Sequence, residues 1–273
     1  MPPARAADPS RTMVNGASLA LAGANVVMQL SRRPVGRAVA ESTVHSGSLV
    51  RHPLKRTRTT LSYVMLALYG TDEERRELRR QVNAQHRAVR PAPGAPVTYR
   101  ATDPELQLWV AACMYYGVRD ALALLYGPAR TEFADEVYRQ CARFATTLQV
   151  PIAAWPRDRD AFEEYWRDAL TRLDVDDVTA RYLIDLIDLR FLPGPLARVA
   201  GPAHRFLTTG FLPPTFRDLL DLEWDAVRQR RFERVVRAGA AVAVRLPRPV
   251  REFPWNWCLY DARRRLRRGR ALV

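Results

Sequence analysis

The chain has 273 residues, of which 48% are hydrophobic and 9% aromatic, a composition that excludes an intrinsically disordered protein. The cysteines Cys113, Cys141 and Cys258 are widely spaced and form no CxxC pair, so neither a zinc site nor a disulfide framework is indicated. The formal net charge of +14 favours an anionic partner such as nucleic acid or an acidic membrane surface, although a solvated basic face has the same signature.

The first helix is expected within residues 17–30. Residues 1–14 before it are rich in Pro, Ala and Arg, which predicts a disordered tail. Asn25 and Gln29 interrupt the apolar run and no small-residue cleavage site follows, so a buried helix fits better than a signal peptide. The longest uninterrupted apolar stretch, 108–118, is about half of the ~20 residues that a membrane-spanning helix needs. We therefore expect no transmembrane span and a cytoplasmic protein.

The next helix is predicted to follow Pro53. Its apolar stripe consists of Leu61, Val64, Met65 and Leu68. Arg56 and Thr60 are four residues apart and share one face of this helix. The planar fork of an arginine pairs bidentately with carboxylates, so an Arg56 near an apolar pocket suits a carboxylate ligand. The alternative is a surface or capping arginine.

Residues 73–89 read as a helix that carries a histidine on its apolar face. Thr71 and Glu74 form a capping-box start, and Pro91 lies just past the end. The apolar face is formed by Leu78, Val82, His86 and Val89. A buried imidazole has to be hydrogen-bonded or bound, because an unpaired polar group in a protein core costs several kcal/mol. A metal or haem iron is one candidate partner, and an ordinary protein acceptor is the other.

Helical patterns continue to the end of the chain. Asp103-Pro104-Glu105 is a strong start for an apolar core helix that runs to about Tyr126. Further helices are predicted over 131–148, around 162–173, over 176–192 and over 215–238, with prolines as breaks between them. No β-alternation and no internal repeat are present. The sequence therefore predicts an all-α fold with one multi-helix domain over 15–260, followed by a basic C-terminal tail over 261–273.

Four stretches, taken in order, resemble the MpaB-type oxygenase / latex clearing protein (rubber oxygenase) superfamily. They are residues 29–46 with the His45-Ser46 pair, 53–71 with Arg56 and Thr60, 82–89 around His86, and 99–110 from Tyr99 to Val110. Later fragments agree with the same resemblance: Pro156 with Phe162, Tyr165 and Trp166, and Leu212-Pro213 with Arg217 and Trp224.

The resemblance implies a globin-like helical core around a b-type haem. It assigns His86 as the proximal iron ligand, and it places Arg56 and Thr60 near the haem, with His45 as a further cofactor contact. Glu41 lies at an offset similar to that of the acidic residue proposed as a base in latex clearing proteins. The family reaction is the oxidative cleavage, with O2, of a carbon–carbon double bond in a long apolar isoprenoid.

Two functions from different classes are compatible with these features. The first is a haem-b-dependent oxygenase that uses O2 on an apolar, lipid-like substrate. The second is a non-catalytic helical protein that binds lipid or a membrane surface through the aromatic segment 253–260 and the arginines after it. A docked aromatic strap with a disordered basic end would explain that segment equally well. Specific nucleic-acid binding is not expected, because no recognised binding motif accompanies the charge.

Overall fold

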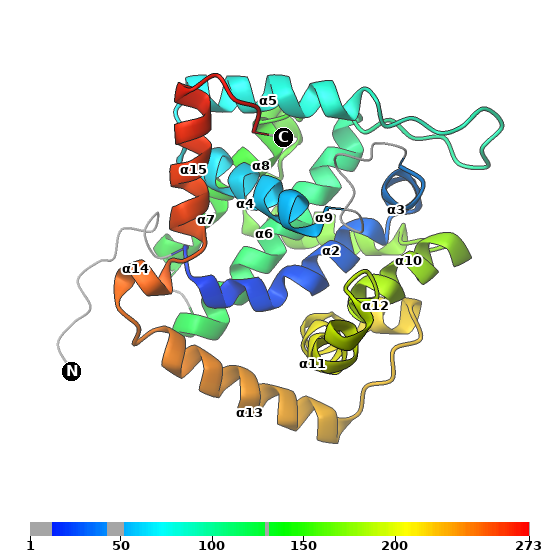
Figure 1. Cartoon of the computed structure of the whole chain (residues 1–273), viewed down its shortest axis with the longest axis vertical. Coiled ribbons are helices and arrows are strands. Elements are labelled where there is room, and N and C mark those ends of the chain that lie inside the picture. The colour runs from blue at the N-terminus through cyan, green and yellow to red at the C-terminus, as the bar shows by residue number, and fades with distance from the viewer. Residues whose placement is uncertain (1–12, 43–51, 129–130, 273) are drawn as a thin grey trace.

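The computed structural model describes residues 13–42, 52–128 and 131–272, and within these ranges every regular element is a helix (Figure 1). The predicted all-α class is confirmed. The elements are η1 (Gly16–Leu21), α2 (Ala22–Leu30), α3 (Arg33–Ala40), α4 (Pro53–Tyr69), α5 (Asp72–His86), α6 (Pro104–Tyr126), α7 (Thr131–Cys141), α8 (Arg143–Thr146), η3 (Ile152–Ala154), α9 (Arg159–Thr171), α10 (Asp177–Ile187), α11 (Gly194–Phe211), α12 (Pro214–Leu219), α13 (Ala226–Ala243), α14 (Arg248–Arg251) and α15 (Trp255–Arg267).

Helix α6 is the central element, as its apolar composition predicts. The Asp103 carboxylate accepts a hydrogen bond from the Glu105 amide at 2.8 Å, and Gly127, with φ of 79°, ends the helix. The helix packs against α2, α8 and α13. By length and composition it could cross a membrane, but 44% of its most apolar window is buried within the protein, and a core helix passes the same test.

Aromatic side chains from α6 and α9 fill the middle of the core. The fully buried Trp109 stacks on Trp166 with ring centroids 5.3 Å apart, and Tyr115 meets Phe162 edge-on at 4.7 Å. Such pairs add about 0.5–1.5 kcal/mol beyond their buried area. This cluster holds α6 and the helices beside it in a fixed relation, which matters for the side chains that α6 and its preceding loop position.

Two of the predicted helices are divided in the structure. The segment 131–148 is two helices, because α7 ends at Cys141 and α8 begins at Arg143. The segment 215–238 is also divided: Asp221 has φ of 50°, and Asp225 starts a new helix by accepting a hydrogen bond from the Arg228 amide at 2.7 Å. In the register of α13 the side chains of Val227 and Val235 are exposed.

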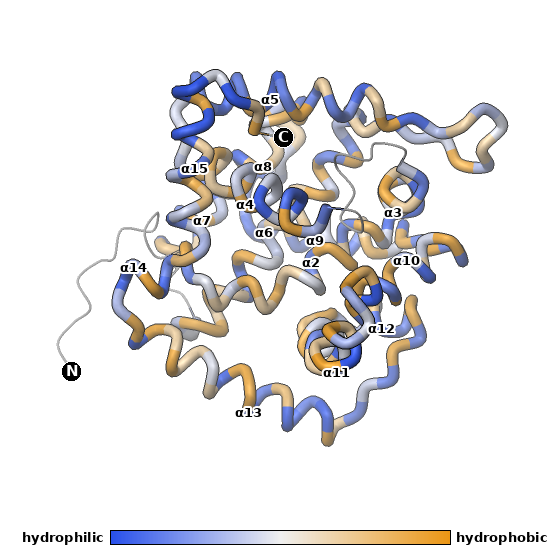
Figure 2. Tube along the Cα trace, viewed as in Figure 1, coloured by the Kyte–Doolittle hydropathy of each residue, from blue (hydrophilic) through white to orange (hydrophobic). Residues whose placement is uncertain are grey.

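Helix α11 was not predicted, since the prolines around it were interpreted as breaks. Pro195 lies in its first turn, where a proline needs no amide hydrogen, and Pro202 is tolerated inside the helix. In Figure 2 α11 is seen nearly end-on and combines hydrophobic and hydrophilic residues. The packing of α11 against α2 and α13 explains why the helix forms despite its two prolines.

Helix α15 continues past residue 260, where the sequence suggests the start of a basic tail. It packs along α4, and the Arg263 guanidinium bonds the Glu74 carboxylate at 3.0 Å. A second small core lies between α4, α5 and the end of the chain, and it consists of Leu66, Leu78, Ala262 and Leu272. Residues 261–272 therefore belong to the folded body.

Candidate functional site

The predicted site residues of α4 and α5 lie at neighbouring ends of these two helices. Helix α5 begins with the predicted capping box, in which the Thr71 hydroxyl and the Glu74 carboxylate each accept a hydrogen bond from the other's backbone amide. The helix ends at His86 itself, so Val89 lies beyond it and does not share the helical face predicted for it. Arg56 stands in the first turn of α4, close enough to His86 for its charge to act on the imidazole.

His86 is a partly buried histidine with a vacant hydrogen-bonding position. Its Nδ1 is buried and has no hydrogen-bond partner among the described residues, while the Ala101 backbone hydrogen-bonds the ring. Burial and, to a smaller extent, the positive charge of Arg56 lower the pKa of His86, and the Ala101 backbone offsets part of this shift, which leaves the pKa at about 4. The imidazole is therefore neutral near pH 7, the form in which a histidine binds a metal.

A second partly buried histidine shows what an ordinary core histidine looks like in this protein. The Nδ1 of His204 lies 2.8 Å from the Ile187 carbonyl oxygen. His52, at the start of α4, is exposed and needs no protein partner. A buried polar atom without a partner is a position at which a ligand could bind, and Nδ1 of His86 is one of thirteen such atoms among the described residues.

Arg56 combines access to solvent with a desolvating environment. Its side chain is exposed, yet desolvation by the surrounding protein lowers its pKa. Tyr182 of α10 lies near enough to interact electrostatically with it. Within the described part of the chain no carboxylate pairs with Arg56, and Thr60, one turn along α4, is exposed beside it. The guanidinium is therefore free to receive an anionic group.

Glu41 is placed differently from Arg56 and His86. It is exposed at the C-terminal end of α3 and forms an ion pair with Arg37, which also bonds Asp176 at the start of α10. Burial is the main cause that raises the pKa of Tyr99, and the negative charge of Glu41 adds to it. The Glu41 carboxylate therefore lies near the loop that leads from Tyr99 to Ala101. A role as a base remains a prediction. His45, the other predicted cofactor contact, lies outside the described residues.

A hydrogen-bond network, not foreseen from the sequence, supports the backbone that contacts His86. The buried Gln107 donates to the Ala101 carbonyl at 2.9 Å and accepts from the Gln149 amide at 3.1 Å. The Gln149 side chain in turn donates to Asn83, one turn before His86 in α5. A glutamine in an otherwise apolar stretch of α6 was the signal that would have drawn attention to it. The network ties the loop, α6 and α5 together around the imidazole.

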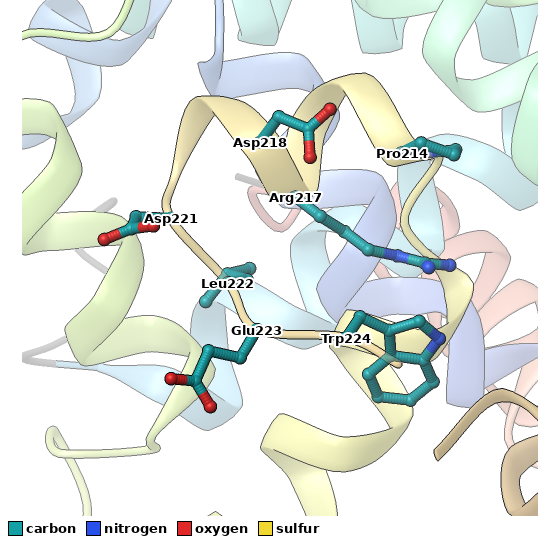
Figure 3. Close-up of a pocket in the computed structure, with 7 residues that line it drawn as sticks. All are labelled: Pro214, Arg217, Asp218, Asp221, Leu222, Glu223 and Trp224. Atoms are coloured by element: carbon teal, nitrogen blue, oxygen red, sulfur yellow. The ribbon is translucent and has the colours of Figure 1, made fainter. Parts of the chain in front are cut away.

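A surface pocket of about 320 Å³ lies elsewhere, between α12 and α13 (Figure 3). It is lined by Pro214, Arg217, Asp218, Asp221, Leu222, Glu223 and Trp224. The carboxylates point in different directions in Figure 3, and Arg217 lies over the Trp224 ring at 5.0 Å while donating to the Gly210 carbonyl. These contacts explain Arg217 and Trp224 as a structural pair that fixes the turn between the helices.

The comparisons with known proteins agree with the resemblance seen in the sequence. Residues 11–241 match the family described as "ER-bound oxygenase mpaB/B'/Rubber oxygenase, catalytic domain". The chain belongs to this family. Two similar proteins are "Uncharacterized protein Mb2261" of Mycobacterium bovis and "Uncharacterized protein Rv2237" of Mycobacterium tuberculosis, each 45% identical over 253 residues, which cover 93% of this chain and 99% of the relative. No solved structure matches the chain. Membership of the mpaB/rubber oxygenase family supports oxygenase chemistry in general.

Proposed function

We propose that this protein is a haem-b-dependent oxygenase that acts on an apolar, lipid-like substrate, with an isoprenoid as the substrate class that the family suggests. The observation that carries the proposal is the buried, unpartnered Nδ1 of His86 beside an Arg56 that lacks a carboxylate partner among the described residues. A buried imidazole nitrogen without a partner is costly, and the exposed Arg56 guanidinium lacks a carboxylate among the described residues. A haem would supply both partners, through its iron and its propionates.

The donor set fits a haem better than a metal ion held by side chains alone. Among the described residues no group of three or more His, Cys, Asp or Glu side chains could hold a metal. A single protein imidazole is enough to hold the iron of a haem, because the porphyrin itself supplies nitrogen ligands. His86 would ligate the iron, and Arg56 would pair with a propionate.

Each residue has a definite task in this proposal. The Ala101 backbone interacts with the imidazole ring, and the lowered pKa keeps the ring unprotonated. Arg56 would hold the haem by pairing with one of its propionates. Once bound, the haem supplies the redox-active iron at which O2 is activated. The substrate would be recognised by apolar contact, which is why we expect a lipid-like molecule.

The proposal is tested by adding haem to the purified protein and recording absorbance. We expect a saturable Soret band, followed by O2 uptake when a linear polyisoprenoid is supplied, with a saturated hydrocarbon of the same length as the control. A protein that binds no haem would contradict the proposal. In that case lipid binding without catalysis, the second candidate, would be the better account of the chain.

Replacement of Arg56 with glutamine is expected to weaken haem binding by roughly tenfold, the size of one charge-assisted hydrogen-bonded pair. Haem dimethyl ester, whose propionates carry no charge, serves as the matched probe. It should bind wild type and Arg56→Gln with equal affinity, because the partner of the guanidinium is then missing in both cases. If the substitution weakens both ligands equally, Arg56 does not pair with a propionate.

Replacement of Gln107 with leucine is expected to lower haem affinity by roughly 10-fold, a typical effect of removing a group that orients a metal ligand. The substitution frees the Ala101 carbonyl and the Gln149 amide. Gln107→Glu keeps an acceptor for the Gln149 amide but cannot donate to the Ala101 carbonyl. It therefore separates the effects of these two hydrogen bonds. A shift in the reduction potential of the bound haem in both variants would show that Gln107 acts through His86. Gln85→Leu in α5 is the control. If the potential is unchanged, Gln107 contributes to stability only.

A further inference from the structure

The segment that contains α14 and α15 exposes large apolar side chains in an unusual number. Val250, Phe253 and Tyr260 are 58–60% exposed, and Trp257 is 48% exposed. These side chains lie close together along the chain: Val250 belongs to α14 and Phe253 to the turn that follows. Trp257 and Tyr260, three residues apart, share one face of α15. The buried side of the same helix carries Cys258 and Ala262 instead.

The same segment concentrates positive charge. Residues 245–272 contain nine arginines against Glu252 and Asp261, a net charge of +7, which is half of the +14 of the whole chain. Arg263 and Arg265 are held by Glu74 and Asp261. Within the described part of the chain Arg264, Arg267 and Arg268 have no acidic partner, and all three are exposed. Their charge is therefore available to an anion outside the protein.

The unpaired charges continue the line of the aromatic side chains. Trp257, Tyr260 and Arg264 follow one another at helical spacing on α15. Together with Phe253, in the turn before the helix, and Arg268, its C-cap residue, they define what we term the α15 face. At its C-terminal end a recess of about 200 Å³ is lined by Asp261, Arg264, Arg265, Arg268 and Arg270. Figure 2 shows this end of α15 as strongly hydrophilic, whereas the end near α14 is paler and mixed with hydrophobic residues.

We propose that the α15 face docks on the surface of an anionic lipid bilayer. Trp and Tyr are favoured at the level of lipid headgroups, where a ring is half in water and half in hydrocarbon. Clustered arginines attract anionic lipids, and the recess among them suits a headgroup phosphate. Interleaved apolar rings and unpaired guanidinium groups, on an exposed helix face, together match a bilayer surface. The proposal does not depend on haem and goes beyond the proposed oxygenase activity.

The test is sedimentation of the full-length protein with vesicles, either of phosphatidylcholine alone or with about a third of phosphatidylserine. We expect binding to the anionic vesicles that weakens with salt. Arg264→Gln with Arg268→Gln should reduce the affinity by about fivefold per arginine, and Trp257→Ser with Tyr260→Ser should also reduce it. The controls are Arg76→Gln with Arg79→Gln, which removes two exposed arginines of α5, and Val199→Ser on α11.

Equal losses in the α5 control and in the α15 variants would overturn the proposal, because the binding would then follow net charge alone. Equal binding to neutral vesicles, or to duplex DNA with the same dependence on Trp257, would also overturn it. Since all the replaced side chains are exposed, thermal unfolding should be unchanged in every variant. The haem spectrum of each variant is recorded in parallel, so a failure of the oxygenase proposal is seen separately from a failure of membrane docking.

Discussion

Replacement of His86 with alanine is expected to abolish the Soret band of the haem-loaded protein and to weaken haem binding by roughly 100-fold or more, since even groups that merely orient a metal ligand contribute 10–100-fold. The substitution removes the buried Nδ1 that has no other hydrogen-bond partner among the described residues. Absorbance titration with haem measures the effect directly. Because alanine is a good helix former and His86 is the last residue of α5, we expect the fold to persist.

Two further variants make this result specific. His52→Ala removes an exposed histidine at the start of α4 and should leave the spectrum intact. His86→Gly opens space for free imidazole, which should restore a Soret band if the lost group was the axial ligand. A Soret band that survives in His86→Ala, unchanged in position, would assign the iron to another side chain.

The sequence predicts the helices that carry the candidate site because their signals are local. The Thr71–Glu74 capping box and the Asp103-Pro104 start depend on residues a few positions apart, and both are present in the structure. The histidine on the apolar face of α5 is likewise a local pattern. The role assigned to Arg56, by contrast, came from resemblance to a family, since one arginine in the first turn of a helix is usually a capping or surface residue.

The surroundings of His86 could not be predicted in the same way. The Ala101 backbone lies beyond a loop of irregular structure, and Gln149, which supports that loop through Gln107, is more than forty residues further along the chain. Such contacts depend on how helices pack, which leaves no periodic trace in the sequence. The prediction of one helix over 215–238 was wrong for a related reason. The left-handed backbone at Asp221 divides the segment, and it has no strong local signal in the sequence. Tertiary packing decides these details, as it does for the prolines of α11.

Acidification of the haem-free protein is expected to lower its free energy of unfolding between about pH 6.5 and pH 4, with His86 as the cause. The pKa of His86 falls from the ordinary value of 6.5 to about 4 on folding, through burial and the nearby charge of Arg56. In that window the unfolded chain binds a proton at this position and the folded chain does not, so protons favour unfolding. The contribution is fully present above pH 6.5 and is lost as the pH falls through 4. A shift of this size corresponds to about 3 kcal/mol.

Urea unfolding at a series of pH values measures this effect, with His86→Gln as the comparison because glutamine does not titrate. The quantity of interest is the change of stability with pH in each protein, since the substitution can also change stability at every pH. Glu77, whose pKa falls to about 2 through its bonds with Arg80 and Gln81, loses its contribution at lower pH and is common to both proteins. Parallel curves for the two proteins between pH 6.5 and 4 would contradict the assignment. A steeper curve for wild type would establish that the folded protein holds the His86 imidazole neutral, as an iron ligand requires.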